Sequence, residues 1–380
     1  MGDSSGTMKI AMLAPVSWPV PPESYGPWEQ VVANLTEALV KRGHEVSLFA
    51  ASGSATSAKL IETVPHPFSL WPGEELKRPQ QLDPGTGLLA GPPHFRALEQ
   101  QHIATCMEAA REGEFDIIHS HLHVHALVFS RLVPCPMITT LHGSAWVQAD
   151  HVILSRYKNQ PFVSISDSER AFKPDLNYVA TVYNGINADM YEYCEVKEDF
   201  LLFSGRIAPE KGAAEAVQIA LKSGRPLKMA GVIEEKYRDY YETTIQPYID
   251  GKNVEYLGLL SQRDLVPFYQ KAKGLLCPIH WAEPFGLVVV EAQACGTPVL
   301  GARKGAFVEI IQEEKTGFLF DDVDEAVRLV QRLDEIEPIA CRQNVEHRFT
   351  AAVMADAYEK VYRTLLKRSD DVPGNIHPGC

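Results

Sequence analysis

Short apolar runs and longer amphipathic stretches alternate along almost the whole chain. The first run, KIAMLAP (9–15), has the composition of a buried strand. The next stretch, PWEQVVANLTEALVKRG (27–43), places its apolar residues at helical spacing and ends on a basic pair and a glycine, which is typical of a helix terminus. In the same half of the chain, further strands are expected at 45–50, 115–121, 136–142, 161–166 and 178–183.

The alternation starts again after residue 195. Strands are expected at 199–205, 226–232, 253–258, 274–279 and 298–302, with helical stretches between them, one of which begins at Glu210. Strands that alternate with helices indicate parallel sheets with right-handed crossovers. Because two such series follow one another, the pattern predicts an α/β protein with two doubly wound domains. The turn-rich stretch 183–193 lies between them and is the expected linker.

Three segments depart from this alternation. The segment 51–95 is rich in Pro and Gly, shows no clear period and predicts a long irregular insertion. Near the other end of the chain, AAVMADAYEKVYRTLLKR (351–368) predicts an amphipathic helix. The last twelve residues, SDDVPGNIHPGC, are expected to be disordered.

Composition narrows the class of protein. A length of 380 residues exceeds one ordinary core and favours two or three domains. The formal net charge of −13 argues against a nucleic-acid partner and, less strongly, against contact with an anionic membrane. No run of about 20 apolar residues appears, so we expect no segment that spans a bilayer. The seven cysteines are scattered, odd in number and never spaced CxxC, which indicates reduced thiols in a cytoplasmic protein.

The stretch FSGRIAPEKGAAEAV (203–217) predicts a strand, a glycine turn and a helix start. Gly205 lets the chain turn at the carboxyl end of the strand, where ligands bind in open parallel sheets. Arg206 and Lys211 flank the helix N-terminus, which attracts anions through its dipole and its free amides. Together they predict a site of the size of a pyrophosphate. The pattern alone gives equal weight to the alternative that both side chains decorate an exposed loop.

The stretch WAEPFGLVVVEAQACGTPVLG (281–301) carries two carboxylates among apolar residues. A helix is expected to begin between residues 284 and 286, because proline is favoured in the first turn. Glu283 then precedes the helix, and Glu291 lies about two turns into it, near the same mouth. Carboxylates bind vicinal hydroxyls strongly, so the pair predicts a polyol site; the alternative is one helix cap and one solvated side chain. The amides expected to face a ligand are those of Phe285, Gly286 and Leu287.

Four histidines lie in IIHSHLHVHALVF (117–129) at a spacing of two: His119, His121, His123 and His125. This spacing on one strand face would suit zinc. The strand is expected to end near His121, however, and HALVFSRLV is expected to be helical, so the four rings should not converge. We therefore expect polar residues at the carboxyl rim of a sheet that line a cleft. His142 in TTLHG occupies the same kind of position after the next strand.

The loop PPESYGPWEQVV (21–32) joins the first strand to the first long helix. Gly26 ahead of a helix again favours an anionic group. Pro27 removes one amide donor at the turn but suits the first helical position. This loop alone is weak support for a phosphate site.

Together these motifs resemble the retaining GT-B glycosyltransferases of family 4, from Met8 to Arg368. The strongest elements are SGRIAPEKG (204–212), EPFGLVVVEA (283–292) followed by GTPVLG, NGI (184–186) and GHEV (43–46). The resemblance implies two Rossmann-like domains that face a central cleft, with the last helix crossing back to the first domain. The implied bounds are 8–190 for an acceptor-binding domain, on which 351–368 packs, and 191–350 for a domain that binds a nucleotide sugar.

For the donor, the resemblance assigns Arg206 and Lys211 to the diphosphate, with Gly205 at the turn that leads to them. Glu283 corresponds to the residue that binds the hydroxyls of the donor sugar. Glu291 corresponds to the residue that binds the ribose hydroxyls. The amides that line the sugar and the phosphates would be those of Phe285, Gly286 and Leu287.

For the acceptor side, the resemblance places His142 near the reacting sugar. Gly26 corresponds to one glycine of a diphosphate loop that usually carries a pair, and Pro27 takes the second position here. The implied acceptor-facing residues are Tyr25, His119, His121 and His142. The acceptor itself is a hydroxyl compound whose identity we expect the loops 51–95 and 143–160 to set.

The resemblance further implies the chemistry. The donor would be a nucleoside-diphosphate sugar, with UDP favoured by its frequency in the family, and no cofactor or metal is expected. Transfer would retain configuration by a front-face substitution in which the leaving phosphate takes the proton of the acceptor. The catalytic residues would be His142, Glu283, Arg206 and Lys211, with Glu283 orienting the sugar without attacking it. The alternatives are a GT-B-like sugar-nucleotide epimerase or phosphorylase, and a non-catalytic protein that binds a nucleotide sugar.

Overall fold

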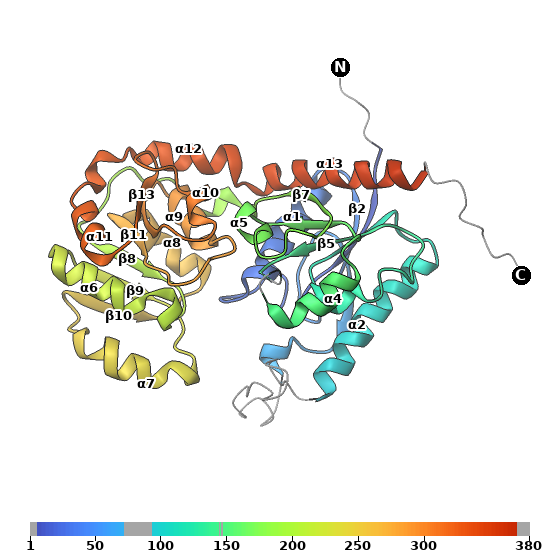
Figure 1. Ribbon diagram of the computed structural model, residues 1–380, viewed down its shortest axis with the longest axis horizontal. Helices are drawn as coiled ribbons and strands as arrows, with labels where there is room; N and C mark the ends of the chain where they lie inside the picture. Colours follow the sequence, from blue (N-terminus) through green and yellow to red (C-terminus); the bar gives the residue numbers. More distant parts are fainter. Residues whose placement is uncertain (1–5, 72–92, 144, 146, 371–380) are drawn as a thin grey trace, which may run out of the picture.

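The computed structural model describes residues 6–71, 93–143, 145 and 147–370 of the chain. In this part of the chain, two sheets form the centres of two lobes (Figure 1). Every strand pairing within each sheet is parallel. The expectation of an α/β protein with two doubly wound domains is therefore confirmed.

The first sheet takes its strands from the first half of the chain. In the order in which they pair, they are β3 (Lys59–Val64), β2 (Glu45–Ala51), β1 (Lys9–Leu13), β4 (Ile117–Ser120), β5 (Met137–Leu141), β6 (Phe162–Ser164) and β7 (Tyr178–Thr181). The α-helices of this half are α1 (Pro27–Lys41), α2 (Pro93–Arg111), α3 (Val124–Leu127), α4 (His151–Arg156) and α5 (Asp167–Arg170). The strand order therefore reverses between β1 and β4: β2 and β3 are added on one side of β1, and β4 to β7 on the other.

The second sheet takes its strands from the second half. In pairing order they are β10 (Val254–Gly258), β9 (Leu227–Ala230), β8 (Leu201–Ser204), β11 (Gly274–Cys277), β12 (Val299–Ala302) and β13 (Gly317–Phe320). Its α-helices are α6 (Ala213–Ser223), α7 (Arg238–Tyr240), α8 (Gln262–Lys271), α9 (Leu287–Ala294), α10 (Phe307–Ile310), α11 (Val323–Val330) and α12 (Pro338–Arg348). The final helix, α13 (Ala351–Asp370), leaves this lobe.

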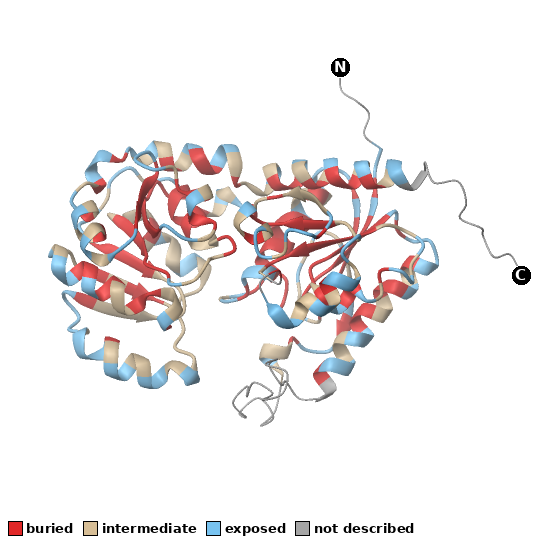
Figure 2. Cartoon of the chain, viewed as in Figure 1, coloured by how far each residue is buried: buried red, intermediate tan, exposed pale blue. Residues whose placement is uncertain are grey.

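The period of two in β1 explains how the first sheet is covered. Ile10 and Met12 face one side and pack with apolar residues of α1 and α13, while Ala11 and Leu13 face the other side and pack with α2. Buried residues are accordingly concentrated on the strands and on the inner helix faces (Figure 2). Both faces of the sheet are shielded, which is the usual condition of a parallel sheet.

The return of α13 to the first lobe is held by packing and by charge. Tyr358 and Tyr362 are buried in the core that α1 builds on β1. At the helix surface, Arg42 pairs with Asp356 at 2.6 Å, and the ring of His44 contacts Glu359 at 3.0 Å. The crossing helix implied by the resemblance is therefore present.

Two segments of the chain, 185–186 and 349–351, run side by side between the lobes. The amide of Ile186 donates to Phe349, and the amide of Ala351 donates back to Ile186, both at 2.8 Å. Gly185 allows this close approach, because a Cβ there would overlap the backbone of Thr350. The NGI motif thus joins the expected linker to the start of α13, although the exact domain bounds at 190 and 350 stay predictions.

One carboxylate joins the two lobes near this connection. Glu309 on α10 accepts hydrogen bonds from the amides of Asp167 and Ser168, at 2.9 and 2.8 Å, at the start of α5. The hydroxyl of Tyr183 in the linker also donates to it at 3.2 Å. The second lobe therefore supplies a carboxylate to the N-terminus of a helix of the first lobe.

Some element predictions were wrong. Strand β3 and the start of α2 lie inside the segment expected to be irregular, of which 72–92 fall outside the described residues. Strand β13 was missed. The helix expected from Glu210 begins at Ala213, after a 3-10 turn over Pro209–Lys211. The stretch expected to be helical after His123 contains only α3, and the C-terminal tail lies outside the described residues from residue 371.

The structure also bears on the cysteines and on membrane-spanning segments. All six described cysteines are free. No described helix has the length and apolar composition needed to cross a membrane.

Candidate functional site

The loop after β8 brings two cations to the carboxyl edge of the second sheet. The amide of Gly205 still bonds to Ala230 on the neighbouring strand, so Arg206 leaves the sheet from its very edge. Arg206 lies 3.1 Å from Glu210 and 3.5 Å from Glu234, and its side chain is 18% exposed. The guanidinium is therefore half-shielded from water and balanced by two carboxylates.

Lys211 and Glu283 meet although 72 residues separate them. The Nζ of Lys211 lies 2.5 Å from the Oε2 of Glu283 and 4.6 Å from the ring centre of Trp281. Gly212 makes this contact possible: it adopts φ +72°, and a Cβ there would overlap the carbonyl oxygen of Pro278 at the end of β11. The glycine after Lys211 thus lets one sheet-edge loop lie directly on the next.

Helix α9 begins at Leu287, four residues after Glu283. Its N-cap is Gly286 in a left-handed conformation, so the helix starts at Leu287 and not at Pro284, which lies in the preceding loop. A Cβ on Gly286 would crowd the Phe307 ring at 2.6 Å. In the first turn, the amide of Val289 donates to the carbonyl of Gly286 at 3.0 Å, whereas the amides of Leu287 and Val288 have no acceptor within the helix.

Glu291 lies deeper than Glu283. It is 6% exposed, and its carboxylate accepts a hydrogen bond from the hydroxyl of Tyr269 at 3.0 Å. Burial raises the pKa of Glu291, and hydrogen bonds from Tyr269 and Tyr191 partly offset this rise. The two glutamates of the motif therefore have different partners: an ammonium group for Glu283 and phenol hydroxyls for Glu291.

The histidines of the first sheet divide into an inner and an outer set. His119 is fully buried beneath α13, where its two ring nitrogens contact Tyr362 and Thr140, each at 2.7 Å. The prediction that His119 lies at the rim of a cleft is therefore wrong, because α13 covers it. His125 is separate again, because it lies at the surface and contacts Glu99 at 2.6 Å.

The outer set consists of His121, His123 and His142. The Nδ1 of His121 lies 2.9 Å from the Nε2 of His142, and the amide of His142 donates to the ring of His123 at 3.4 Å. Burial lowers the pKa of His123 to about 3 and that of His121 and His142 well below the usual range. These rings are neutral at pH 7. Among the described residues, no three His, Cys, Asp or Glu side chains are arranged to hold a metal ion.

The loop before α1 faces the second lobe. Burial raises the pKa of the Tyr25 hydroxyl, and the charges of Arg206, Glu234 and Glu283 also act on it, so this tyrosine lies in the field of the second sheet edge. Gly26 follows with φ +146°, and a Cβ at this position would lie only 2.8 Å from the Cβ of Pro22. Pro27 is the first residue of α1, as expected.

Several residues of this region escaped the sequence analysis. Glu29 in the first turn of α1 is 2% exposed, accepts a bond from the amide of Trp18 at 3.2 Å, and has its pKa raised by burial to about 7. Glu169 is also buried; it bonds to the amide of Gly143 beside His142, and burial raises its pKa to about 8. The capping-box spacing of SDSE (166–169) was a signal for Glu169.

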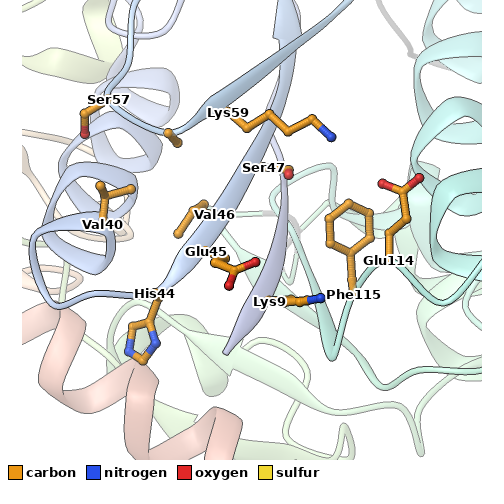
Figure 3. Close-up of a pocket in the computed structure, with 11 residues that line it drawn as sticks. Lys9, Val40, His44, Glu45, Val46, Ser47, Ser57, Lys59, Glu114 and Phe115 are labelled. Atoms are coloured by element: carbon orange, nitrogen blue, oxygen red, sulfur yellow. The ribbon is translucent and has the colours of Figure 1, made fainter. Parts of the chain in front are cut away.

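One hollow in the described part of the chain lies away from these residues. It has a volume of about 460 Å³ and is lined by Lys9, His44, Glu45, Lys59 and Phe115, among others (Figure 3). Lys9 and Glu45 are the first residues of β1 and β2, so this hollow is at the amino ends of the strands. Ligands of open parallel sheets bind at the carboxyl ends, and none of the expected site residues lines this hollow.

Comparison with known proteins covers both lobes. The family model described as "Glycosyl transferases group 1" matches residues 194–349, and the one described as "Glycosyltransferase Family 4" matches residues 28–189. A glycogen synthase of Mycobacterium tuberculosis is 26% identical over 352 residues, which cover 82% of this chain and 81% of the relative.

Two further comparisons point the same way. A D-inositol 3-phosphate glycosyltransferase of Arthrobacter is 25% identical over 344 residues, covering 76% of this chain and 77% of the relative. The crystal structure of Anabaena HepE in complex with UDP and glucose is similar with a TM-score of 0.69 at 17% identity, over 94% of this chain and 100% of HepE. The fold of both lobes is therefore shared with that structure.

Proposed function

We propose that this chain, which belongs to the GT-B glycosyltransferases of family 4 type, moves a sugar from UDP to a hydroxyl acceptor with retention of configuration and without a metal. The observation that carries the proposal is the contact of Lys211 with Glu283 beside the start of α9. A cation, a carboxylate and free helix amides then lie within one donor-sized site. The family membership supports transferase activity; the donor, the stereochemistry and the residue roles are our proposal.

Arg206 and Lys211 stabilise the charge that develops on the departing diphosphate. Both are half-buried, so their charges are screened less by water than those of surface cations. In the structure, carboxylates pair with both cations, and a bound diphosphate would compete with Glu283 for Lys211. Such competition frees the Glu283 carboxylate to accept hydrogen bonds from the hydroxyls of the donor sugar.

Glu291 binds the ribose in this proposal. Its carboxylate keeps acceptor capacity beyond the bonds from Tyr269 and Tyr191, because a carboxylate has about four lone-pair sites. Glu291 lies about one turn into α9 and Glu283 lies in the loop before the helix, so we assign the two carboxylates to different ends of a nucleotide sugar. The amides of Phe285, Gly286 and Leu287 line the phosphates and the sugar between them.

The transfer step follows from these positions. The bond between the anomeric carbon and the phosphate oxygen breaks, and the acceptor oxygen bonds to the same face of the sugar. The proton of the acceptor passes to the departing phosphate oxygen. His142 is neutral and buried, so it orients sugar and acceptor and does not deliver a proton as an imidazolium. Glu283 is held by Lys211 and acts as a binding group, not as a nucleophile.

Support for UDP comes from the similar structure with UDP and glucose bound. We place Tyr25, Gly26, His121 and His142 on the acceptor side. Tyr25 and Gly26 precede α1 in a loop that faces the second lobe, and His121 and His142 directly follow β4 and β5 of the first sheet. His119 acts only through neighbours, since its ring nitrogens are engaged inside the core. The cytoplasm is the proposed location.

The first test measures donor binding by thermal unfolding. At about 100 times its dissociation constant, UDP should raise the melting temperature by about 5 °C or more. Glu291→Ala should lose most of this shift, and Glu255→Ala, which changes an exposed carboxylate of β10, should keep it. No stabilisation of the wild type by any nucleoside diphosphate would contradict the proposal.

The second test addresses the reaction. NMR of the full chain with UDP-glucose, UDP-galactose or UDP-N-acetylglucosamine follows slow transfer to water, and the proposal predicts the α-configured sugar as first product. A β-configured first product would contradict retention. Formation of an altered sugar nucleotide would instead indicate an epimerase, and binding without any turnover would indicate a non-catalytic protein.

A further inference from the structure

Two aromatic side chains remain accessible on the first-lobe side of the site. Trp28 in the first turn of α1 keeps 42% of its surface accessible, and Tyr25 keeps 39%. The indole of Trp28 packs edge-on against His123, with ring centres 4.8 Å apart, and nearly parallel to His142, with centres 6.1 Å apart. We call the accessible face of Trp28 the aromatic platform. An accessible aromatic side chain beside convergent polar groups is typical of binding sites.

The polar groups beside this platform are neutral and incompletely bonded. Among the described residues, the Nε2 atoms of His121 and His123 and the Nδ1 atom of His142 are buried without a hydrogen-bond partner. His121 and His142 also share one hydrogen bond, so the proton position in one ring fixes which ring presents a donor and which an acceptor. Buried polar atoms normally find partners, and hydroxyl groups can serve as both donor and acceptor.

The cations that we assign to the donor lie on the edge of the second sheet. Arg206 and Lys211 come from the second lobe, are balanced by carboxylates, and hold the diphosphate under the proposed function. An anionic acceptor stacked on Trp28 would meet the rings of His123 and His142, which burial keeps neutral and which would not compensate its charge.

We propose that the acceptor is an uncharged sugar or glycoside, whose ring stacks on Trp28 and whose hydroxyls bond to the imidazoles of His123 and His142. A pyranose ring has an apolar face of C–H groups and a rim of hydroxyls. An indole bordered by neutral imidazoles is complementary to both parts. The inference rests on the proposed function, because it assigns the charged rim to the donor and leaves the platform to the acceptor.

The test measures acceptor binding without turnover. Saturation-transfer NMR on the full chain saturated with UDP uses matched probes: a panel of neutral methyl pyranosides and myo-inositol, each beside its phosphorylated form. At least one neutral probe should bind, and its phosphorylated form should bind about tenfold more weakly or not at all, equivalent to about 1.4 kcal/mol. Equal or tighter binding of the phosphorylated forms overturns the inference, and so does an absence of binding by every neutral probe.

Substitutions at Trp28 test the stacking itself. Trp28→Ala should weaken binding of the neutral probe about tenfold, and Trp28→Phe should restore most of it, because a smaller ring still stacks. Tyr248→Ala removes an aromatic residue of the second lobe that is 50% exposed, and it should leave probe binding as in the wild type. Unchanged probe binding in Trp28→Ala would overturn the stacking.

A titration with UDP distinguishes failure of the proposed function from failure of the acceptor proposal. Each sample is first titrated with UDP, and its melting temperature is recorded, so a misfolded variant is recognised before any probe is added. Absence of UDP binding by the wild type contradicts the proposed function and, with it, the acceptor proposal. UDP binding combined with a preference for phosphorylated probes contradicts the acceptor proposal alone.

Discussion

The two sheet edges that face each other in this molecule differ in charge. The edge of the second sheet carries Arg206, Lys211 and Glu283 in close ion pairs. The edge of the first sheet carries an indole and imidazoles that burial keeps neutral. Because the same α/β topology builds both edges, the difference comes from side chains and not from the fold. In our proposals, the charged edge binds the anionic diphosphate and the neutral edge binds the hydroxyls of the acceptor.

The largest test of this difference removes a charge from the second edge. Lys211→Ala should lower the rate of UDP release from a UDP-sugar by about 10²–10³-fold, because a preorganised donor to the developing negative charge is lost. Steady-state assays of UDP formation measure this rate. Lys222→Ala removes a lysine of the same lobe that pairs with Asp324 at the surface, and it should leave the rate unchanged. Equal rates for Lys211→Ala and Lys222→Ala would contradict a charged donor edge.

A smaller effect is expected from a buried carboxyl of the first edge. The folded-state pKa of Glu29 is about 7 because of burial, above its ordinary value of 4.5. Between these pH values the unfolded chain has released the proton and the folded chain still holds it, so the free energy of unfolding falls as pH rises. The loss should reach the order of 2 kcal/mol by pH 8.

The measurement is urea unfolding at pH 5 and pH 8 for the wild type and for Glu29→Gln. The glutamine can still accept the bond from Trp18 but has no proton to lose, so its free energy of unfolding should fall less between the two pH values. Glu45→Gln, at an exposed strand end, serves as the control and should behave as the wild type. An equal pH dependence in Glu29→Gln and the wild type would show that this edge is not kept neutral by burial.

The smallest effect separates the two glutamates of the second edge. Tyr269→Phe removes a hydroxyl that donates to Glu291 and leaves the Lys211–Glu283 pair intact. UDP affinity, measured by calorimetry, should fall about three- to tenfold, in keeping with one hydrogen bond of about 1 kcal/mol. A loss of turnover at unchanged UDP affinity would instead connect Tyr269 to the transferred sugar.

The sequence predicted the alternation well because each buried strand is a compact apolar run. Strand β3, KLIETV, escaped because it is an edge strand inside a polar segment, and only its last two residues are buried. Strand β13, GFLF, escaped because four residues after a turn give little period to detect. The start of α9 was placed too early because Pro284 suits a first turn, whereas Gly286 forms the actual N-cap.

The site was predicted in part. The motifs identified Arg206, Lys211, Glu283 and Glu291, but no local pattern shows that Lys211 touches Glu283, since this contact depends on two loops from different strands. The period of two in the first sheet suggested that His119 and His121 share a face. It did not show that α13, more than 200 residues later, covers His119. Such long-range burial is not encoded in any short stretch.

The most direct test of the central claim is a crystal structure of the full chain with UDP-glucose. We predict that the diphosphate lies within hydrogen-bond distance of Arg206 and Lys211, that the glucose hydroxyls contact Glu283, and that the ribose contacts Glu291. Trp28 should then lie across from the glucose, with room for an acceptor ring. A nucleotide bound instead in the hollow beside Lys9 and Glu45, with the contact of Lys211 and Glu283 unchanged, would contradict the account.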